Sequence, residues 1–270
     1  MKQNTCIVVV PVYKESPDQF EITSFHQCCK ILGNRTISLV THKELNCDIY
    51  YSIAQQYGIA LERNDFDKSF FQGIAGYNKL CLSPNFYKRF KNYTYMLIYQ
   101  LDAFVFYDNL DYWCEEGYDY VGAPWSELKC DVLFGLVGNG GFSLRRNRTF
   151  QRHLSHKGTL FSIRYNFQKY YKGTFVSLLI FLAHCVGYHN NINYLFKKGI
   201  NEDAFFFQYL RDSKLRIRTP LPIEAGHFAF EHIPSTMYKH YGELPMGCHY
   251  WNKVEYESFW KNHISLHEQE

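Results

Sequence analysis

The sequence predicts an α/β fold in which a mostly parallel sheet is flanked by helices. Three short apolar runs alternate with two amphipathic segments near the N-terminus, and this β-α-β-α-β order is typical of a parallel sheet joined by right-handed crossovers. Apolar residues make up 46% of the 270 residues, which is enough to bury a sizeable core. We expect a single domain over residues 1–270, with a first half at 1–125 and a second half at 126–270.

The N-terminal elements follow one another closely. Residues 6–12 are a short β-branched run that predicts a buried strand. A helix is expected over residues 16–33, with Ser16 or Asp18 as its cap and Gly33 as its end.

The same alternation continues for another helix and strand. Residues 35–42 predict the second strand, residues 46–57 a helix and residues 59–63 the third strand. Residues 72–91 have a helical pattern that Pro84 interrupts.

The next predicted strand, residues 95–102, ends on a carboxylate. Its sequence YMLIYQLD is apolar up to Asp102, and a charge in such a run is costly unless it is paired, hydrogen-bonded or metal-bound. In open α/β sheets, ligands bind beyond the carboxyl ends of the strands. Because Tyr13, His42 and Asp102 all follow such ends, we expect Asp102 at the mouth of a cleft.

The second half is less regular. Residues 118–125 (YDYVGAPW) predict a strand that runs into a Pro-Trp turn, and residues 137–145 (VGNGGFSLR) predict a glycine-rich loop that enters another strand. Residues 201–211 (NEDAFFFQYLR) predict a helix with Asn201 as N-cap and two acids in its first turn. From Arg216 onward the prolines and glycines are typical of loops.

Charge is distributed unevenly along the chain. No Asp or Glu occurs from Val132 to Asn201, and residues 145–201 carry ten Lys/Arg, which leaves 19 Lys/Arg against 26 Asp/Glu elsewhere, a net charge of −7. A basic segment in an otherwise acidic protein favours an anionic partner. A nucleic acid is not expected, because no recognition motif is present.

Two interpretations of this basic, aromatic and helical insertion stay open. Its apolar run 175–187 is too short to span a membrane. The segment is either a core helix with a basic rim, or an amphipathic surface in peripheral contact with an anionic membrane.

The cysteines point to a reducing compartment. All nine are scattered and none forms a CxxC pair, which argues against a disulfide framework and against a zinc site. The short N-terminal apolar run lacks the basic region and cleavage site of a signal peptide. We therefore expect a cytoplasmic protein, with the inner face of the membrane as the surface it would meet.

The chain resembles glycosyltransferases of the GT-A type, through VVVPVYKE at the first strand, YQLDAFVF at the fourth, GNGGFSLR and NEDAFFF. More closely, the segments YQLDAFVF, YDYVGAPW, VGNGGFSLR, NEDAFFF and PMGCHYW, in this order, are similar to a little-characterised bacterial family of transferases. The matching segments extend over residues 7–251.

The resemblance implies a nucleotide-diphospho-sugar donor, with a UDP-sugar expected, bound by the first half across the strand ends. It implies transfer of a hexosyl group to a glycan or a lipid-linked acceptor, held by the second half, in surface polysaccharide synthesis. The donor-binding residues it implies are Pro11, Val12, Tyr13, Glu15, Asn78, Lys79, Gln100, Asp102, Ala103, Asn139, Gly140 and Gly141. Trp125 and Phe142 are the residues expected to contact the acceptor.

An inverting transfer needs a base that deprotonates the acceptor hydroxyl. The resemblance implies that NEDAFFF supplies this base, with Asp203 as the closer match and Glu202 as the second choice or a contact to the acceptor. The structural alternative is that both acids only stabilise the start of a helix.

A metal ion, Mn²⁺ or Mg²⁺, is implied with Asp102 and His249 as ligands. The Asp-x-Asp pattern of the family is incomplete, because Gln100 or Phe104 stands where the other acid would be. One carboxylate, His249 and two phosphate oxygens would still hold such an ion. Neutralisation of the diphosphate by basic side chains is the alternative.

Other interpretations remain. A sugar-phosphate nucleotidyltransferase has a related fold, but its loop after the first strand is rich in glycine and basic residues, where this chain reads PVYKESPDQF. A carbohydrate-binding protein without catalysis would use the 19% aromatic residues but would give Asp102 and Asp203 no role. The ordinary structural alternatives are a hairpin turn for the glycine loop, core packing for Trp125, a structural His249 and a solvated helix face for Asn78 and Lys79.

Overall fold

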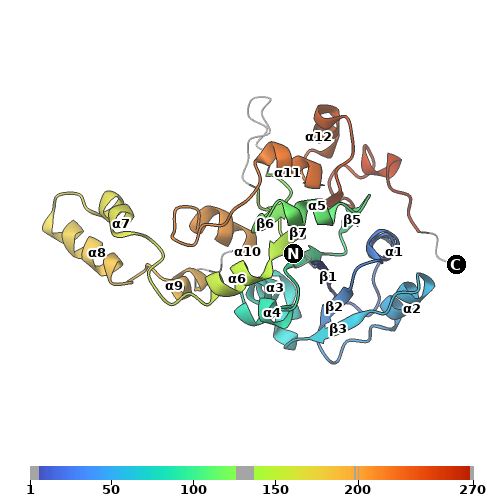
Figure 1. Cartoon of the computed structure of the whole chain (residues 1–270), viewed down its shortest axis with the longest axis horizontal. Coiled ribbons are helices and arrows are strands. Elements are labelled where there is room, and N and C mark those ends of the chain that lie inside the picture. The colour runs from blue at the N-terminus through green and yellow to red at the C-terminus, as the bar shows by residue number, and fades with distance from the viewer. Residues whose placement is uncertain (1–5, 126–136, 198, 200, 268–270) are drawn as a thin grey trace.

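The computed structural model describes residues 6–125, 137–197, 199 and 201–267. A six-stranded sheet lies at its centre (Figure 1). From one edge to the other the strands are β3 (Glu62–Asp65), β2 (Ile37–Thr41), β1 (Cys6–Pro11), β4 (Tyr95–Tyr99), β7 (Phe142–Arg146) and β6 (Tyr120–Gly122). The strands β1 to β4 are parallel, and β7 is antiparallel to both of its neighbours. The predicted α/β fold with a mostly parallel sheet is confirmed.

Each face of the sheet has its own hydrophobic cluster, because successive strand residues point to opposite faces. Val8 and Val10 of β1 belong to the cluster beneath the helices α1 (Gln19–Leu32) and α2 (Asp48–Gln56). Ile7 and Val9 belong to the opposite cluster. That second face is covered by α3 (Gly73–Cys81), α4 (Pro84–Arg89) and α6 (Asn147–Leu154).

Two predicted helix boundaries have clear physical causes. The Asp18 carboxylate accepts hydrogen bonds from the N–H groups of Phe20 and Glu21, and the Glu21 carboxylate accepts one from the N–H of Asp18. This capping box makes Asp18, not Ser16, the cap of α1. Pro84 begins α4, after η1 (Lys68–Phe71) and α3, which confirms the break predicted there.

The strand predicted over residues 95–102 is too long. It ends at Tyr99, and the chain turns so that the N–H of Ala103 donates to the carbonyl of Gln100 at 2.9 Å. It then enters β5 (Ala103–Val105), which pairs with β9 (Gly247–His249) in a second sheet that β8 (Ala229–Phe230) completes. The apolar pattern continues across the turn because both segments are buried, so the sequence does not mark where one strand ends.

The loop-like tail predicted from Arg216 is also wrong. It contains α11 (Pro222–Phe228), α12 (Pro234–Tyr241) and η3 (Trp260–Asn262). Each of the two α-helices has proline in its first turn, where the missing N–H costs nothing. The prolines therefore start helices here. A further short helix, α5 (Leu110–Glu115), lies between β5 and β6 in the sequence.

The middle of the basic segment forms a helical arm, residues 161–196, that extends away from the sheet (Figure 1). It contains α7 (Ile163–Tyr170), α8 (Phe175–Cys185) and α9 (Ile192–Phe196). The helix predicted over 201–211 is shorter than expected, with α10 (Glu202–Ala204) running into a π-helical turn, η2 (Phe205–Tyr209). In the part of the chain that the structure describes, no helix is long and apolar enough to cross a membrane. Lys198 of the basic segment lies outside the described residues.

Candidate functional site

The predicted cleft residues begin where β1 and β4 end. Tyr13 follows β1 and is 58% exposed. Burial of its hydroxyl raises the pKa of Tyr13, Lys14 opposes the rise, and the charges of Glu21 and Asp102 add to it. Tyr13 and Asp102 are therefore within electrostatic reach of each other, on the same edge of the sheet.

Asp102 is held by His249, which reaches it from the second sheet. The pairing of β5 with β9 puts Ala103 opposite His249, and His249 Nε2 lies 3.0 Å from Asp102 Oδ1. The same Nε2 lies 3.2 Å from Gln100 Oε1. The other ring nitrogen, Nδ1, lies 3.2 Å from Oε1 of Glu231, so the imidazole is set between two carboxylates.

The two carboxylates favour a positive charge on His249. Burial lowers the pKa of His249, but the carboxylates of Asp102 and Glu231 outweigh it and raise the value to about 9. For Asp102, burial raises the pKa, whereas His249 and Lys253 lower it below its usual value. A deprotonated Nε2 would face two oxygen acceptors, Asp102 Oδ1 and Gln100 Oε1. A proton on Nε2 satisfies these acceptors, and a bound cation could take its place.

Gly140 and Gly141 of the predicted glycine-rich loop lie between the His249 cluster and the acids Glu202 and Asp203. A Cβ at Gly141 would overlap the imidazole of His249, and a Cβ at Gly140 would overlap the Glu202 carboxylate. The loop is fixed by Asn139, whose Oδ1 accepts a hydrogen bond from the N–H of Gly141 at 3.0 Å. Only glycine at both positions lets the backbone pass this closely between the two groups.

The Glu202 carboxylate forms a buried ion pair on the far side of these glycines. Oε1 of Glu202 lies 2.7 Å from Arg145 Nη2, and both side chains are almost fully buried. Arg145 also donates to the carbonyl of Gly140 and to the hydroxyl of Tyr87. This network fixes the start of α10 against β7, so Glu202 is a positioning residue in this arrangement.

Asp203 is only partly buried and has a perturbed acidity. Burial, followed by the negative charge of Glu202, raises the pKa of Asp203 to about 6. The N–H of Ala204 and the charge of Arg145 oppose the rise, and Glu231 adds to it. Glu231 belongs to the His249 cluster. Its charge therefore links the acidity of Asp203 to that cluster, on the other side of Gly140 and Gly141.

Asn78 makes two hydrogen bonds at the start of α10. Its Oδ1 accepts a hydrogen bond from the N–H of Glu202 at 3.1 Å, and its Nδ2 donates to Asn201 Oδ1 at 3.0 Å. Asn201 is the N-cap residue as predicted, but it makes no side-chain bond to the helix. The next residue, Lys79, is exposed, as is Glu15, whose carboxylate accepts a hydrogen bond from the N–H of Asn46.

Three predicted contact residues are placed in the core instead. The side chains of Val12, Ala103 and Phe142 are fully buried, and Phe142 packs on Tyr99 and Phe228. None of the three side chains can contact a ligand in this conformation, because apolar strand residues beside the site turn inward. The Pro11 ring is buried as well.

Trp125 is partly buried and lies against Gly138. A Cβ on that glycine would come within 2.8 Å of the indole, and the ring of Phe207 packs edge-on to it at 6.1 Å. One part of the indole is therefore fixed by core contacts, and the rest is accessible.

Three residues of the site were not predicted from the sequence. Glu231 follows β8 and orients His249, Arg145 pairs with Glu202, and Lys253 lies 3.9 Å from Asp102 Oδ2. No local motif indicates Glu231 or Lys253, because tertiary pairing of the tail brings them to Asp102. Arg145 stands in GNGGFSLR, where a charge in a predicted strand is a signal that could have indicated a buried pair.

The metal ligands are fewer than a closed site requires. Among the described residues, no group of three or more His, Cys, Asp and Glu side chains is arranged to hold a metal ion. Asp102 and His249 offer one oxygen and one nitrogen, and Gln100 offers a further oxygen beside them. Such a set suits a hard divalent cation that completes its shell with ligands from elsewhere.

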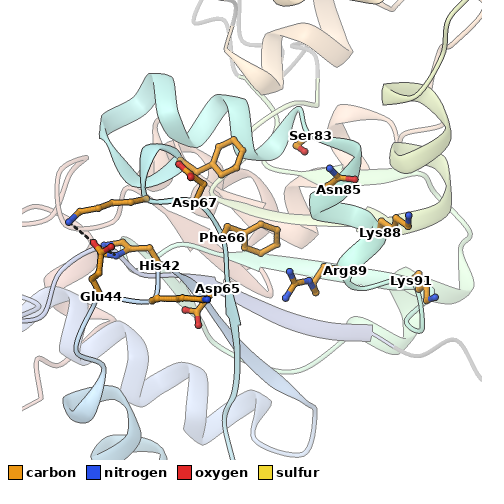
Figure 2. Close-up of a pocket in the computed structure, with 13 residues that line it drawn as sticks. His42, Glu44, Asp65, Phe66, Asp67, Ser83, Asn85, Lys88, Arg89 and Lys91 are labelled. Atoms are coloured by element: carbon orange, nitrogen blue, oxygen red, sulfur yellow. Dashed lines mark hydrogen bonds and ion pairs between the residues drawn. The ribbon is translucent and has the colours of Figure 1, made fainter.

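A separate pocket of about 880 Å³ lies beside β2 and β3, between their carboxyl ends and α4. Figure 2 shows His42, Glu44 and Asp65 at one side of it and Lys88, Arg89 and Lys91 at the other. Of Tyr13, His42 and Asp102, only His42 lines it, and none of the expected donor, acceptor, catalytic or metal residues does. The chemically distinctive groups therefore lie outside this pocket.

Three solved structures are similar to this chain over most of its length. Mouse xyloside xylosyltransferase 1 in its apo form is similar over 91% of this chain and 96% of its own, with 10% identity and a TM-score of 0.48. The apo glycosyltransferase GlyE of Streptococcus pneumoniae TIGR4 is similar over 97% of this chain and 60% of its own, with 16% identity and a TM-score of 0.46. Core-mannan synthase A of Aspergillus fumigatus, in its Mn/GDP form, is similar over 75% of this chain and 72% of its own, with 12% identity and a TM-score of 0.41.

No curated protein matches this chain. Residues 60–249 match the family described as "Protein of unknown function (DUF5672)". That range includes β4, the glycine loop, α10 and His249. The chain belongs to this family.

Proposed function

We propose that this protein is a glycosyltransferase of the GT-A type that moves a sugar from a nucleotide-diphospho-sugar to a hydroxyl of an acceptor. The observation that carries the proposal is that two sets of polar side chains lie on opposite sides of Gly140 and Gly141. On one side Asp102 and Gln100 each place an oxygen within 3.2 Å of Nε2 of His249, an arrangement that suits a bound cation. On the other side Asp203 has a pKa of about 6. Transfer to a hydroxyl needs a positive charge that neutralises the leaving diphosphate. It also needs a base, here a carboxylate whose pKa lies near neutral pH.

The donor lies across the strand ends in this proposal. Tyr13, exposed after β1, stacks on or borders the nucleoside, and the diphosphate lies towards Asp102. Lys253 is the cation best placed to meet the diphosphate, because its Nζ is already 3.9 Å from Asp102. We favour a UDP-sugar as the donor. Lys79 and Glu15 are retained as nucleotide contacts because both are accessible.

The residues fit a divalent cation. Asp102, His249 and Gln100 would hold Mn²⁺ or Mg²⁺, and Glu231 would orient the imidazole from behind, as carboxylates do for metal-bound histidine. Such an ion, when bound, would neutralise the diphosphate as it leaves. Because the raised pKa of His249 keeps a proton on the ring, metal binding would have to displace that proton.

Asp203 is the proposed general base. The acceptor hydroxyl gives its proton to the Asp203 carboxylate while its oxygen forms a bond to the anomeric carbon. The bond from that carbon to the diphosphate oxygen breaks, and the nucleoside diphosphate leaves with the electron pair. Attack from the face opposite the leaving group inverts the anomeric configuration. Glu202 takes no proton in this scheme, because Arg145 holds it in a buried ion pair.

The acceptor side is formed by the second half of the chain. The accessible part of Trp125 offers a flat apolar surface that a sugar ring could stack on. We propose a glycan or lipid-linked glycan as the acceptor, with surface polysaccharide synthesis as the pathway. Phe142, being buried, has no part in this proposal.

The test is nucleotide release from a panel of UDP- and GDP-sugars, with and without Mn²⁺. Release of UDP or GDP from one donor is the expected result, and it should accelerate when the acceptor is supplied. Formation of pyrophosphate from a nucleoside triphosphate and a sugar 1-phosphate would instead support a nucleotidyltransferase. Carbohydrate binding without any turnover would contradict both enzymatic functions.

A further inference from the structure

The arm, residues 161–196, has its apolar side chains on the outside. The helices α7 and α8 pack against each other, and three polar side chains, Asn166, Ser177 and His184, are buried in this pair. The exposed apolar side chains are Ile163, Phe167, Phe175, Val176, Leu178, Leu179, Ile180, Leu182 and Val186. In water an amphipathic helix pair places these two groups the other way round.

Two of the three buried polar side chains, Ser177 and His184, make hydrogen bonds. His184 stacks on Tyr170 with ring centroids 3.8 Å apart, and its Nδ1 lies 2.8 Å from the carbonyl oxygen of Ile180. The hydroxyl of Ser177 donates to the carbonyl of Thr174 at 2.8 Å. At the base of the arm, Asn190 accepts hydrogen bonds from the N–H groups of Leu160 and Phe161. Asn166 is the exception, because neither its Nδ2 nor its Oδ1 has a hydrogen-bond partner among the described residues. The apolar side chains named above remain exposed.

The charges around this apolar surface are of one sign. Lys157, Arg164, Lys169, Lys172 and Lys197 are exposed on the arm or at its base. No acid occurs in the sequence from residue 132 to residue 201. Exposed apolar side chains and exposed basic side chains on the same arm match an anionic lipid surface, in which acyl chains cover the apolar groups and headgroups meet the cations.

The same charges argue against a second copy of this chain as the occupant. Two arms in an isologous contact would place their basic rims against each other. The arm also extends as a projection from the body (Figure 1), a shape that suits a broad surface. α8 has 11 residues and a length of about 16 Å, so it can lie in the headgroup region without spanning the bilayer.

We infer that the arm inserts its apolar surface into the interfacial region of an anionic membrane and anchors the protein there. The side chains of Phe175, Leu179 and Val186 enter the acyl boundary. Lys169 and Lys172 contact lipid phosphates. This inference goes beyond the proposed transfer reaction and rests on the surface of the arm alone.

Sedimentation with lipid vesicles tests the inference in the absence of any nucleotide sugar. The full chain should bind vesicles in which about a third of the lipid is phosphatidylglycerol, and binding to pure phosphatidylcholine should be about tenfold weaker or less. Leu179→Glu should weaken binding to the anionic vesicles about tenfold. Leu221→Glu is the control, because Leu221, the residue that precedes α11, is also exposed (68%, against 50% for Leu179) but lies outside the arm.

Both leucines are exposed, so neither variant should change the thermal unfolding of the protein, which is measured alongside. Absence of vesicle binding, or equal losses in Leu179→Glu and Leu221→Glu, would overturn the inference. A dimer in solution that Leu179→Glu dissociates, with no binding to vesicles, would show that a second copy covers the arm. Because no donor is present, these outcomes are independent of whether transfer occurs.

Discussion

At the residue scale, Asp102 explains how a lone carboxylate is tolerated beside an apolar strand. Its charge is matched by the imidazole of His249 at 3.0 Å and by Lys253 at 3.9 Å. Glu231 in turn matches the other side of the imidazole. A carboxylate with charged partners keeps its ionised form in spite of burial, and its accessible oxygen can still meet a ligand because the side chain is 21% exposed.

Asp203 allows a direct test of the proposed base. Asp203→Asn should lower the transfer rate by a factor of about 10² to 10⁴, because the amide cannot accept the acceptor proton, and it should leave UDP affinity unchanged. Asp212→Asn, a change in a nearby exposed acid, is the control. A variant at Asp203 that transfers normally would remove this residue as the base.

The acidity of Asp203 also predicts a pH profile. The base works when ionised, so kcat/KM should rise about tenfold per pH unit below pH 6 and level off above it, given the pKa of about 6. For stability the sign is opposite. The pKa is raised above its unfolded value, so the group stabilises the fold below about pH 4, and this contribution is lost as pH rises through about 6. A rate that falls between pH 5 and pH 7 would contradict the assignment.

At the scale of elements, the loop before β7 lies between the His249 cluster and the acids Glu202 and Asp203. Gly141→Ala should push His249 away from Asp102, because the new Cβ would overlap its ring. We expect a loss of about 1–3 kcal/mol in the free energy of unfolding and weaker donor binding. Gly158→Ala is the control, because the nearest atom there is Nε2 of His156 at 3.0 Å, a far milder approach than the overlap of a Cβ at Gly141 with His249. Equal effects of the two substitutions in denaturant unfolding and in UDP titrations would refute this role of the loop.

The contact between β7 and α10 depends on one ion pair. Arg145→Met should cost about 3–5 kcal/mol in the free energy of unfolding, because it leaves the Glu202 carboxylate buried without its partner. Arg146→Met, at the exposed neighbouring position of β7, should change stability by less than about 1 kcal/mol. The comparison is made by urea denaturation. Similar losses for both substitutions would mean that the buried pair has no special role.

Elements with a strong local signal could be predicted from the sequence, and elements defined by tertiary contacts could not. The strands β1 and β2 and the helix α1 have clear periodicity and a capping box, so their positions follow from local physics. The turn after Tyr99 has no such signal, because buried residues continue on both sides of it. The strands β8 and β9 have only two and three residues, and they form because β9 pairs with the edge of β5 and β8 pairs with β9.

At the scale of the whole molecule, the same distinction applies to the site. Asp102, His249, Glu202 and Asp203 stand in short motifs, and the topology of a parallel sheet predicts that strand ends meet. Their partners Glu231 and Lys253 are recognised only once the tail folds back over β5. The uneven charge of the sequence predicted an anionic partner for the basic segment and left a core helix and an amphipathic surface as alternatives. Which side chains the arm turns outward is seen only in the structure.

The most direct measurement of the central claim is a calorimetric titration of UDP, in the presence of Mn²⁺, into three forms of the protein. The wild type should bind UDP, Asp102→Asn should bind it about tenfold or more weakly, and Asp203→Asn should bind it as the wild type does. This pattern would locate the nucleotide at the strand ends and separate binding from proton transfer. Absence of UDP binding to the wild type, or equal binding by Asp102→Asn, would contradict the proposed donor site.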